Sequence, residues 1–169
     1  MNELLARKFI YQNARPLDLA RWQFCFENGS REAVFTALAV YQNDDGGFGH
    51  GLEPDCWNPN SSPIQTWTAT EIIRETGLEE KEHPLVQGIL RYLASGKDFD
   101  GHTWANTITT NNDAPHAPWW QHTSNHEISY NPTASLITFI FEFADSESEL
   151  FALALKLAKE AYLYFKSHF

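Results

Sequence analysis

The sequence predicts an all-α protein built from repeated pairs of helices. Apolar residues recur at helical spacing in successive segments, and an Asp-Gly turn followed by an aromatic residue occurs twice between such segments. The first turn spans Gln42 to Gly49, and a weaker version spans Asp98 to Trp104. The only β-branched cluster, residues 107–110, is isolated, and a lone strand cannot satisfy its own backbone. We therefore expect no sheet.

The first three helices are expected over residues 2–13, 17–27 and 31–42. Pro16 separates the first two, because the residue before a proline avoids the helical conformation. Ser30 precedes the third helix and can act as its N-cap. Apolar residues at helical spacing then run through this third segment, which indicates a helix with one buried side.

Two further helices are expected over residues 63–76 and 84–95. Each opens with a proline, Pro63 or Pro84, at the first helical position, where the missing N–H group costs no hydrogen bond. Ser62 stands directly before the first of these prolines and can cap that helix. These start signals predict where both helices begin.

The last two helices are expected over residues 132–144 and 147–166. Asn131-Pro132 repeats the pattern of a cap followed by a proline, and Ser146 with Glu149 forms a capping box. The first of the two helices is apolar almost all round, so it is expected to be buried on most sides.

We expect one domain with an internal repeat, because helix pairs joined by the same turn are typical of α/α solenoids and toroids. Cys25 and Cys56 are too few for a disulfide framework. The predicted organisation of residues 1–169 is N-terminal helices over 1–29, a first helix-pair unit over 30–77, a second unit over 83–144 with a long loop over 97–130, and the start of a third unit over 147–169.

Four residues of the first turn, Asp45, Gly46, Gly47 and Phe48, are predicted to have a structural role. Glycine reaches positive φ without steric cost, so one of the two glycines is expected there. Phe48 is large enough to pin the turn to a core, so it is expected to be buried.

The first turn and the helix start that follows it carry a resemblance to a known family. Residues 41–49, Tyr-Gln-Asn-Asp-Asp-Gly-Gly-Phe-Gly, lead into Ser-Pro-Ile-Gln-Thr-Trp-Thr-Ala-Thr at residues 62–70. This resembles the repeat of the terpenoid cyclase and protein prenyltransferase superfamily, which includes squalene-hopene cyclases and prenyltransferase β subunits. The resemblance implies an α/α toroid, partial or half-complete at this length, whose inner helices begin at a central cavity. Gln65, Trp67 and Asn131 are then expected to bind substrate there. The cyclase acid motif and the prenyltransferase zinc ligands have no counterpart in this sequence.

Candidate chemistry lies in the two long loops. Glu53, Asp55 and His116 are candidate catalytic residues, because carboxylates and imidazole serve as acids and bases near neutral pH. His50, Asp55 and Cys56 are weaker candidates for a divalent metal site, since imidazole, carboxylate and thiolate all bind zinc. The alternative is that these are ordinary loop and cap residues and that the cysteine is simply buried.

Residues 115–120 join two prolines to the adjacent tryptophans Trp119 and Trp120. Prolines stiffen a segment and tryptophans give it apolar surface. We expect these tryptophans to bind substrate, either as one wall of a hydrophobic pocket or by stacking on sugar rings. The alternative is a loop that covers the core.

Three functions remain open from the sequence. The resemblance favours a transferase or cyclase-like enzyme that acts on an apolar, isoprenoid-like substrate in an aromatic-lined cavity. A carbohydrate-active α/α toroid would also use carboxylates and tryptophans. A non-catalytic binding or assembly protein would show a large exposed apolar face.

Charge and hydropathy limit the partners. The net charge of −10 argues against nucleic acid and anionic membrane surfaces, which both require a basic face. No run reaches the roughly 20 apolar residues that span a bilayer, and no secretory leader is recognised, so a cytoplasmic protein is expected. The apolar residues of the last helix need more partners than the preceding helix supplies. We therefore expect a homo-oligomer or one half of a longer chain.

Overall fold

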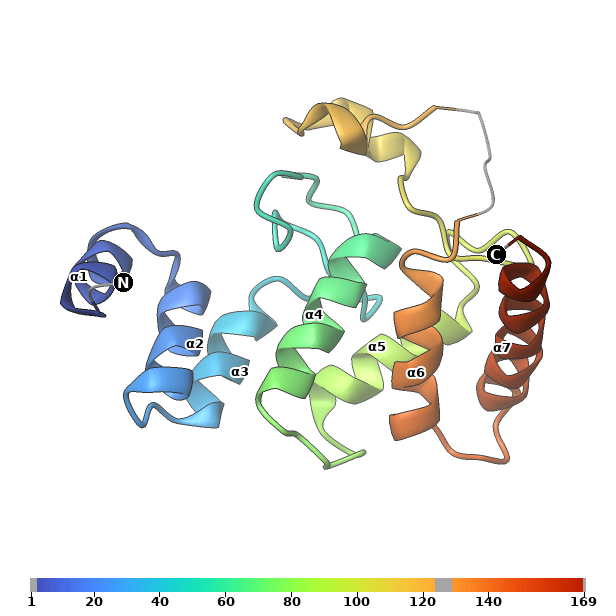
Figure 1. Cartoon of the computed structure of the whole chain (residues 1–169), viewed down its shortest axis with the longest axis horizontal. Helices are drawn as coiled ribbons and strands as arrows, with labels where there is room; N and C mark the ends of the chain where they lie inside the picture. The colour runs from blue at the N-terminus through green and yellow to red at the C-terminus, as the bar shows by residue number, and fades with distance from the viewer. Residues whose placement is uncertain (1–2, 124–128, 169) are drawn as a thin grey trace. The chain divides into compact units, whose positions relative to one another are not determined.

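The computed structural model describes residues 3–123 and 129–168, except the side chain of His168. Within these ranges it contains seven α-helices, two short 3-10 helices and no β-strand (Figure 1), which confirms the all-α prediction. The chain divides into two compact units, residues 1–40 and 41–169, which we describe separately. The boundary falls inside the predicted helix-pair unit 30–77, so that grouping remains a prediction.

The N-terminal unit consists of three helices. The second and third pack against each other and bury apolar residues that include Leu17, Val34 and Leu38. The Ser30 hydroxyl accepts a hydrogen bond from the Ala33 N–H (3.1 Å), so its predicted role as N-cap is confirmed. The helices are α1 (Glu3–Asn13), α2 (Pro16–Phe26) and α3 (Arg31–Ala39).

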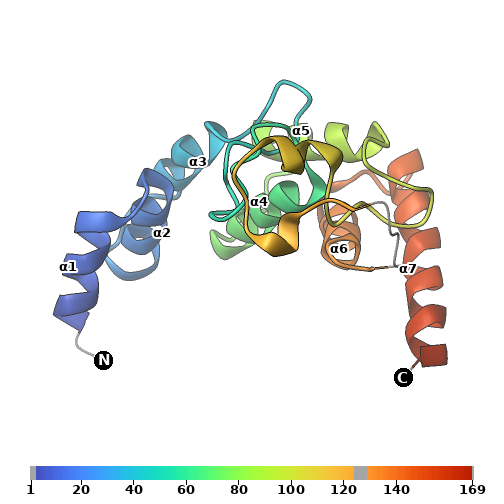
Figure 2. The ribbon, with the colours of Figure 1, turned by 90° about the horizontal axis from the view of Figure 1, so that it is seen from above.

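The second unit is organised around one apolar helix, α6. This helix packs against α4, α5 and α7, and Figure 2 shows it between α4 and α7. Its buried residues include Leu136, Phe139 and Ile140, as its almost wholly apolar sequence predicts. The helices of the unit are α4 (Pro63–Glu75), α5 (Pro84–Ala94), α6 (Thr133–Phe143) and α7 (Glu149–His168), with 3-10 helices at Thr109–Asp113 and Pro118–Trp120.

Two of the helix ends that differ from the prediction belong to α3 and α6. Helix α3 ends at Ala39 rather than residue 42, because the chain turns and Gln42 pairs with Phe48. Helix α6 begins at Thr133, and Pro132 occupies its N-cap position without a side-chain cap, so the predicted start at Asn131-Pro132 is wrong.

The cap of α7 also differs, because Ser148 rather than Ser146 performs the capping. The Ser148 hydroxyl accepts a hydrogen bond from the Phe151 N–H (3.2 Å). Asp145 organises the turn before it, since its carboxylate accepts from the Glu147 N–H (2.9 Å). The predicted capping box is therefore replaced by an aspartate turn followed by a serine cap.

The two Asp-Gly turns have the same internal geometry. Gly46 and Gly101 have φ of +91° and +97°. In the first turn the Asp45 carboxylate accepts from the Gly47 N–H (3.0 Å), and in the second the Asp100 carboxylate accepts from the His102 N–H (2.8 Å). The predicted positive φ at one of the two glycines of the first turn is confirmed.

Each turn is joined to the helix that follows it by a threonine. The Phe48 N–H donates to the Thr66 hydroxyl of α4 (3.1 Å), and the Trp104 N–H donates to the Thr133 hydroxyl of α6 (2.8 Å). Phe48 is fully buried, as predicted, and Trp104 is 1% exposed. The internal repeat therefore extends from sequence to hydrogen bonding.

The fold shifts the pKa of two aspartates in opposite directions, Asp45 in the first turn and Asp98 at the start of the second. Burial works against ionisation of Asp45, but hydrogen bonds from Ser61 (2.6 Å), Lys97 (3.0 Å) and the Gly47 N–H keep the pKa of its carboxyl below the usual value. Burial raises the pKa of Asp98, and the hydrogen bond from the Tyr92 hydroxyl (3.2 Å) only partly offsets it. The folded state therefore binds the Asp98 proton more tightly than the unfolded chain does.

Asp98→Asn is expected to gain stability over the wild type as the pH rises. A raised pKa in the folded state contributes stability below the unfolded value, about 3.9, and that contribution is lost as the pH rises through the folded pKa. The variant cannot ionise, so its advantage should grow between about pH 4 and pH 7. Urea unfolding of both proteins across this range measures the difference.

Asp100→Asn is the matched control with the opposite sign. Burial opposes ionisation of Asp100, but hydrogen bonds from Thr103 and His102 lower the pKa of its carboxyl overall. This variant should be less stable than the wild type at pH 7, with a deficit that shrinks below about pH 4. An Asp98→Asn difference that is constant with pH would contradict the interpretation.

Candidate functional site

The two long loops of the second unit lie together at the end where α4 and α6 begin (Figure 1). The Trp57 N–H donates to the Pro115 carbonyl (3.0 Å), and the Ala117 N–H donates to the Asp55 carbonyl (2.8 Å). Cys56 and His116 therefore face each other as an isolated antiparallel bridge. We call residues 50–61 and 107–122 the loop platform.

Asn58 is the polar centre of the loop platform and is fully buried. Its side-chain nitrogen donates to the Thr110 hydroxyl (2.8 Å) and to the Asn111 side-chain oxygen (2.9 Å), across the two loops. Its side-chain oxygen accepts from the Asn60 N–H (3.0 Å). Since one residue satisfies partners on both loops, it fixes how the loops lie against each other.

Gln65 connects α4 to the loop platform by two hydrogen bonds. This fully buried side chain accepts from the Leu52 N–H (2.9 Å) and donates to the Asn58 carbonyl (3.0 Å). The sequence predicted Gln65 as a substrate-binding residue, and its hydrogen bonds are made to the protein itself. Its role in the structure is to position the loop.

The predicted catalytic residues lie in or beside the loop platform and have protein partners. The Asp55 carboxylate accepts from the Trp120 indole N–H (2.5 Å), so the structure brings these two predicted residues together. The His116 ring contacts the Ala114 carbonyl (2.6 Å) and the Gln121 side chain (3.2 Å). Glu53 accepts from the Thr68 hydroxyl of α4 (3.1 Å).

The remaining predicted residues are dispersed. Asn131 is exposed at the start of α6. The Trp67 side chain is partly exposed, and its indole N–H is buried without a hydrogen-bond partner among the described residues. The His50 ring contacts the Asn43 side chain (2.8 Å). Cys56 is buried, and burial raises the pKa of its thiol.

Metal binding was expected at His50, Asp55 and Cys56. Over residues 3–123 and 129–168, no group of three or more His, Cys, Asp or Glu side chains is arranged to hold a metal ion. The raised pKa of the Cys56 thiol disfavours the thiolate that a metal would bind.

The solvent-facing side of α4 and α6 carries polar residues that the sequence analysis missed. Arg74 forms an ion pair with Glu71 of its own helix (2.8 Å) and another with Glu142 of α6 (3.0 Å). It also donates to the Ser135 carbonyl of α6 (3.3 Å). We call Thr68, Glu71, Arg74, Thr138 and Glu142 the polar face. On α4 the signal was present, because Thr68, Glu71 and Arg74 recur every three residues on one side of a helix.

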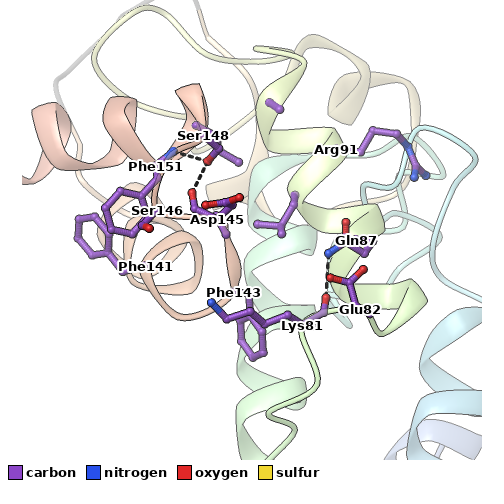
Figure 3. A pocket seen from close by; sticks show the side chains of 14 residues that line it. Lys81, Glu82, Gln87, Arg91, Phe141, Phe143, Asp145, Ser146, Ser148 and Phe151 are labelled. Atoms are coloured by element: carbon purple, nitrogen blue, oxygen red, sulfur yellow. Dashed lines mark hydrogen bonds between the residues drawn. The ribbon is translucent and has the colours of Figure 1, made fainter.

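A separate groove of about 950 Å³ lies between α5 and the turn that joins α6 to α7 (Figure 3). Phe141, Phe143 and Phe151 give it apolar surface, while Gln87 and Asp145 are among its polar lining residues. None of the residues predicted from the sequence as catalytic, substrate-binding or metal-binding lines this groove.

Comparison of the chain with protein-family models, curated proteins and solved structures finds no match. Among the helices described by the structure, none has the combination of length and apolar sequence needed to cross a membrane.

Proposed function

We propose that this chain binds a carbohydrate on the loop platform and the polar face. The observation that carries the proposal is a pair of exposed tryptophans on fixed loops, since Trp57 is 65% and Trp119 is 66% exposed. The Trp57 indole N–H donates to the Pro54 carbonyl (2.8 Å), which orients its ring. Trp119 lies in the 3-10 helix that Trp120 anchors through Asp55.

Exposed indole rings suit a sugar, because the apolar face of a pyranose packs on an aromatic ring while its hydroxyl groups remain hydrogen-bonded. Each of these two indoles leaves about two-thirds of its apolar surface in water, which costs free energy. A ligand that covers the ring would recover that free energy. Loops held by buried hydrogen bonds present these rings without a large ordering penalty.

The polar face favours a hydroxylated ligand over an isoprenoid chain. Its residues are two carboxylates, one guanidinium and two threonines, with Glu53 bonded to Thr68 at its edge. An apolar chain would remove these charges from water without replacing their hydrogen bonds, which costs free energy. We therefore rank the isoprenoid substrate that the resemblance implies below a sugar.

The charge of this surface narrows the ligand to neutral or amino sugars. Glu53, Glu71 and Glu142 stand against a single cation, Arg74, and the whole chain carries a net charge of −10. Uronic acids and sulfated sugars would be repelled by such a surface. We limit the proposal to binding, because both carboxylates of the polar face are already paired with Arg74.

We also propose that the helix pairs form part of an α/α toroid. The support is that both Asp-Gly turns have a positive-φ glycine and a backbone N–H bonded to a threonine of the following helix. Helix pairs joined by similar turns are typical of stacked helix-pair architectures.

Titration calorimetry with soluble glucan, mannan, xylan and chito-oligosaccharide tests the binding proposal, with polygalacturonate as the acidic counterpart. We expect binding of at least one neutral or amino-sugar glycan and none of polygalacturonate. Trp57→Ala and Trp119→Ala should each weaken that binding about five- to tenfold, since aromatic stacking contributes roughly 1–1.5 kcal/mol.

Tyr162→Ala is the matched control, because Tyr162 is equally exposed (65%) but lies on α7 away from the loop platform in sequence and contacts. Its affinity should equal that of the wild type. The proposal fails if no glycan binds, or if both tryptophan variants bind as tightly as the wild type.

A further inference from the structure

Helix α7 has apolar residues on two opposite sides. One side packs against α6 and buries Ala154, Leu157 and Ala161. On the other side Leu155, Tyr162 and Leu163 are 45%, 65% and 62% exposed. A helix that is apolar on both sides is typically covered on both.

The exposed side has the spacing that helices use when they pack along one another. Ala152, Leu155, Lys159, Tyr162 and Lys166 follow one another at intervals of three and four residues, which places them in one stripe. Ala158, Lys159, Tyr162 and Leu163 line a shallow hollow of about 420 Å³ on this side. We call these residues, with Lys156, the outer face of α7.

The outer face is basic in an acidic protein. Lys156, Lys159 and Lys166 are three of the six lysines in a chain of net charge −10. The Glu160 carboxylate contacts the His102 ring nitrogen (3.2 Å) and forms an ion pair with the Lys156 ammonium group (3.6 Å). Lys159 makes no ion pair within the described part of the chain.

We propose that the outer face of α7 is a docking surface for an amphipathic helix of another protein. Apolar side chains of that helix would cover Leu155, Tyr162 and Leu163, and acidic side chains on its flanks would pair with the lysines. The charge of the outer face is the reason for an acidic partner, since complementary charges guide and select helix pairs.

A second copy of this chain fits the outer face less well. In the register that overlays the whole stripe, Lys159 of one helix meets Lys159 of the other, whether the helices run parallel or antiparallel. Like charges placed together at an interface disfavour association. This inference is independent of the carbohydrate proposal, because it uses no residue of the loop platform or the polar face.

The test uses the whole chain and two synthetic 21-residue helical peptides. Both carry leucine at the two apolar heptad positions, and they carry either glutamate or lysine at the flanking positions. Fluorescence anisotropy of labelled peptide at about 50 mM salt measures binding, since screening is weak there. We expect the acidic peptide to bind at least about tenfold more tightly than the basic one.

Lys159→Glu should lower the affinity for the acidic peptide about tenfold and raise the affinity for the basic peptide. Lys81→Glu is the matched control, because it makes the same change in net charge at an exposed residue outside α7 and should leave both affinities unchanged. Circular dichroism checks that both variants remain folded. The proposal is overturned if neither peptide binds, if Lys81→Glu has the same effect, or if sedimentation shows a dimer that Tyr162→Asp dissociates.

Discussion

Gly46→Ala is expected to destabilise the second unit by about 3 kcal/mol or more, although it adds only one methyl group. Gly46 has a φ of +91°, which an L-residue adopts only with strain. A Cβ built there would also lie 2.1 Å from the Gly88 carbonyl oxygen of α5. Because the obstacle is helix backbone, α5 and the turn would have to separate.

The same contact explains why α5 has a glycine at its centre. The Gln42 side chain donates to the Gly46 carbonyl (2.9 Å) and to the Leu85 carbonyl of α5 (3.2 Å). A Cβ on Gly88 would lie 2.2 Å from the Gln42 side-chain nitrogen. Gly88 therefore lets the turn approach the helix closely enough for these bonds.

Gly101→Ala is the matched control for Gly46→Ala. Gly101 has a φ of +97° in the second turn, but among the described residues no atom beyond its own chain neighbours lies within 4 Å of a Cβ built there. Its replacement should cost only the conformational strain, about 1–2 kcal/mol. Urea unfolding of both variants separates strain from packing, and equal losses would contradict the proposed contact between the turn and α5.

The helices and the first turn could be predicted because their signals are local. The sequence of α6 is apolar almost all round, which indicates a buried helix, and proline at the start of α4 and α5 marks where each helix begins. The glycine requirement at Gly46 follows from the Asp-Gly sequence of the turn. The spacing of Ser146 and Glu149 predicts the wrong serine as the cap of α7, because it does not reveal the turn that Asp145 forms before Ser148.

The loop platform could not be predicted, because its bonds join residues far apart in the sequence. Asn58 and Thr110 are 52 positions apart, and Asp55 and Trp120 are 65 positions apart. Loops have no periodicity that would indicate which segments pair. The sequence did identify Asp55, His116 and Trp120 as notable residues, but their arrangement depends on the fold of the whole second unit.

Asn58→Ala is expected to release the two loops of the platform from each other. The substitution leaves the Thr110 hydroxyl, the Asn111 side chain and the Asn60 N–H without their partner. The bond to Asn111 is buried and the other two are partly buried, and a buried polar group left unpaired costs about 1–3 kcal/mol, so the local loss is expected to be about 2–3 kcal/mol. Hydrogen exchange at the Trp57 and Ala117 amides, which bond across the loops, should accelerate at least about tenfold.

Asn60→Ala separates this effect from an ordinary asparagine substitution in the same loop. Asn60 is exposed, and within residues 3–123 and 129–168 its side-chain nitrogen donates only to the Asn58 side-chain oxygen (3.1 Å). Its replacement should change stability by less than about 0.5 kcal/mol, as is usual at the surface.

Asn58→Ala should also weaken glycan binding, because Trp57 and Trp119 lie on opposite loops. The substitution replaces neither tryptophan, so the loss would come from the arrangement of the loops. Unchanged exchange at Trp57 and Ala117 in Asn58→Ala would show that the backbone bonds alone hold the loops together.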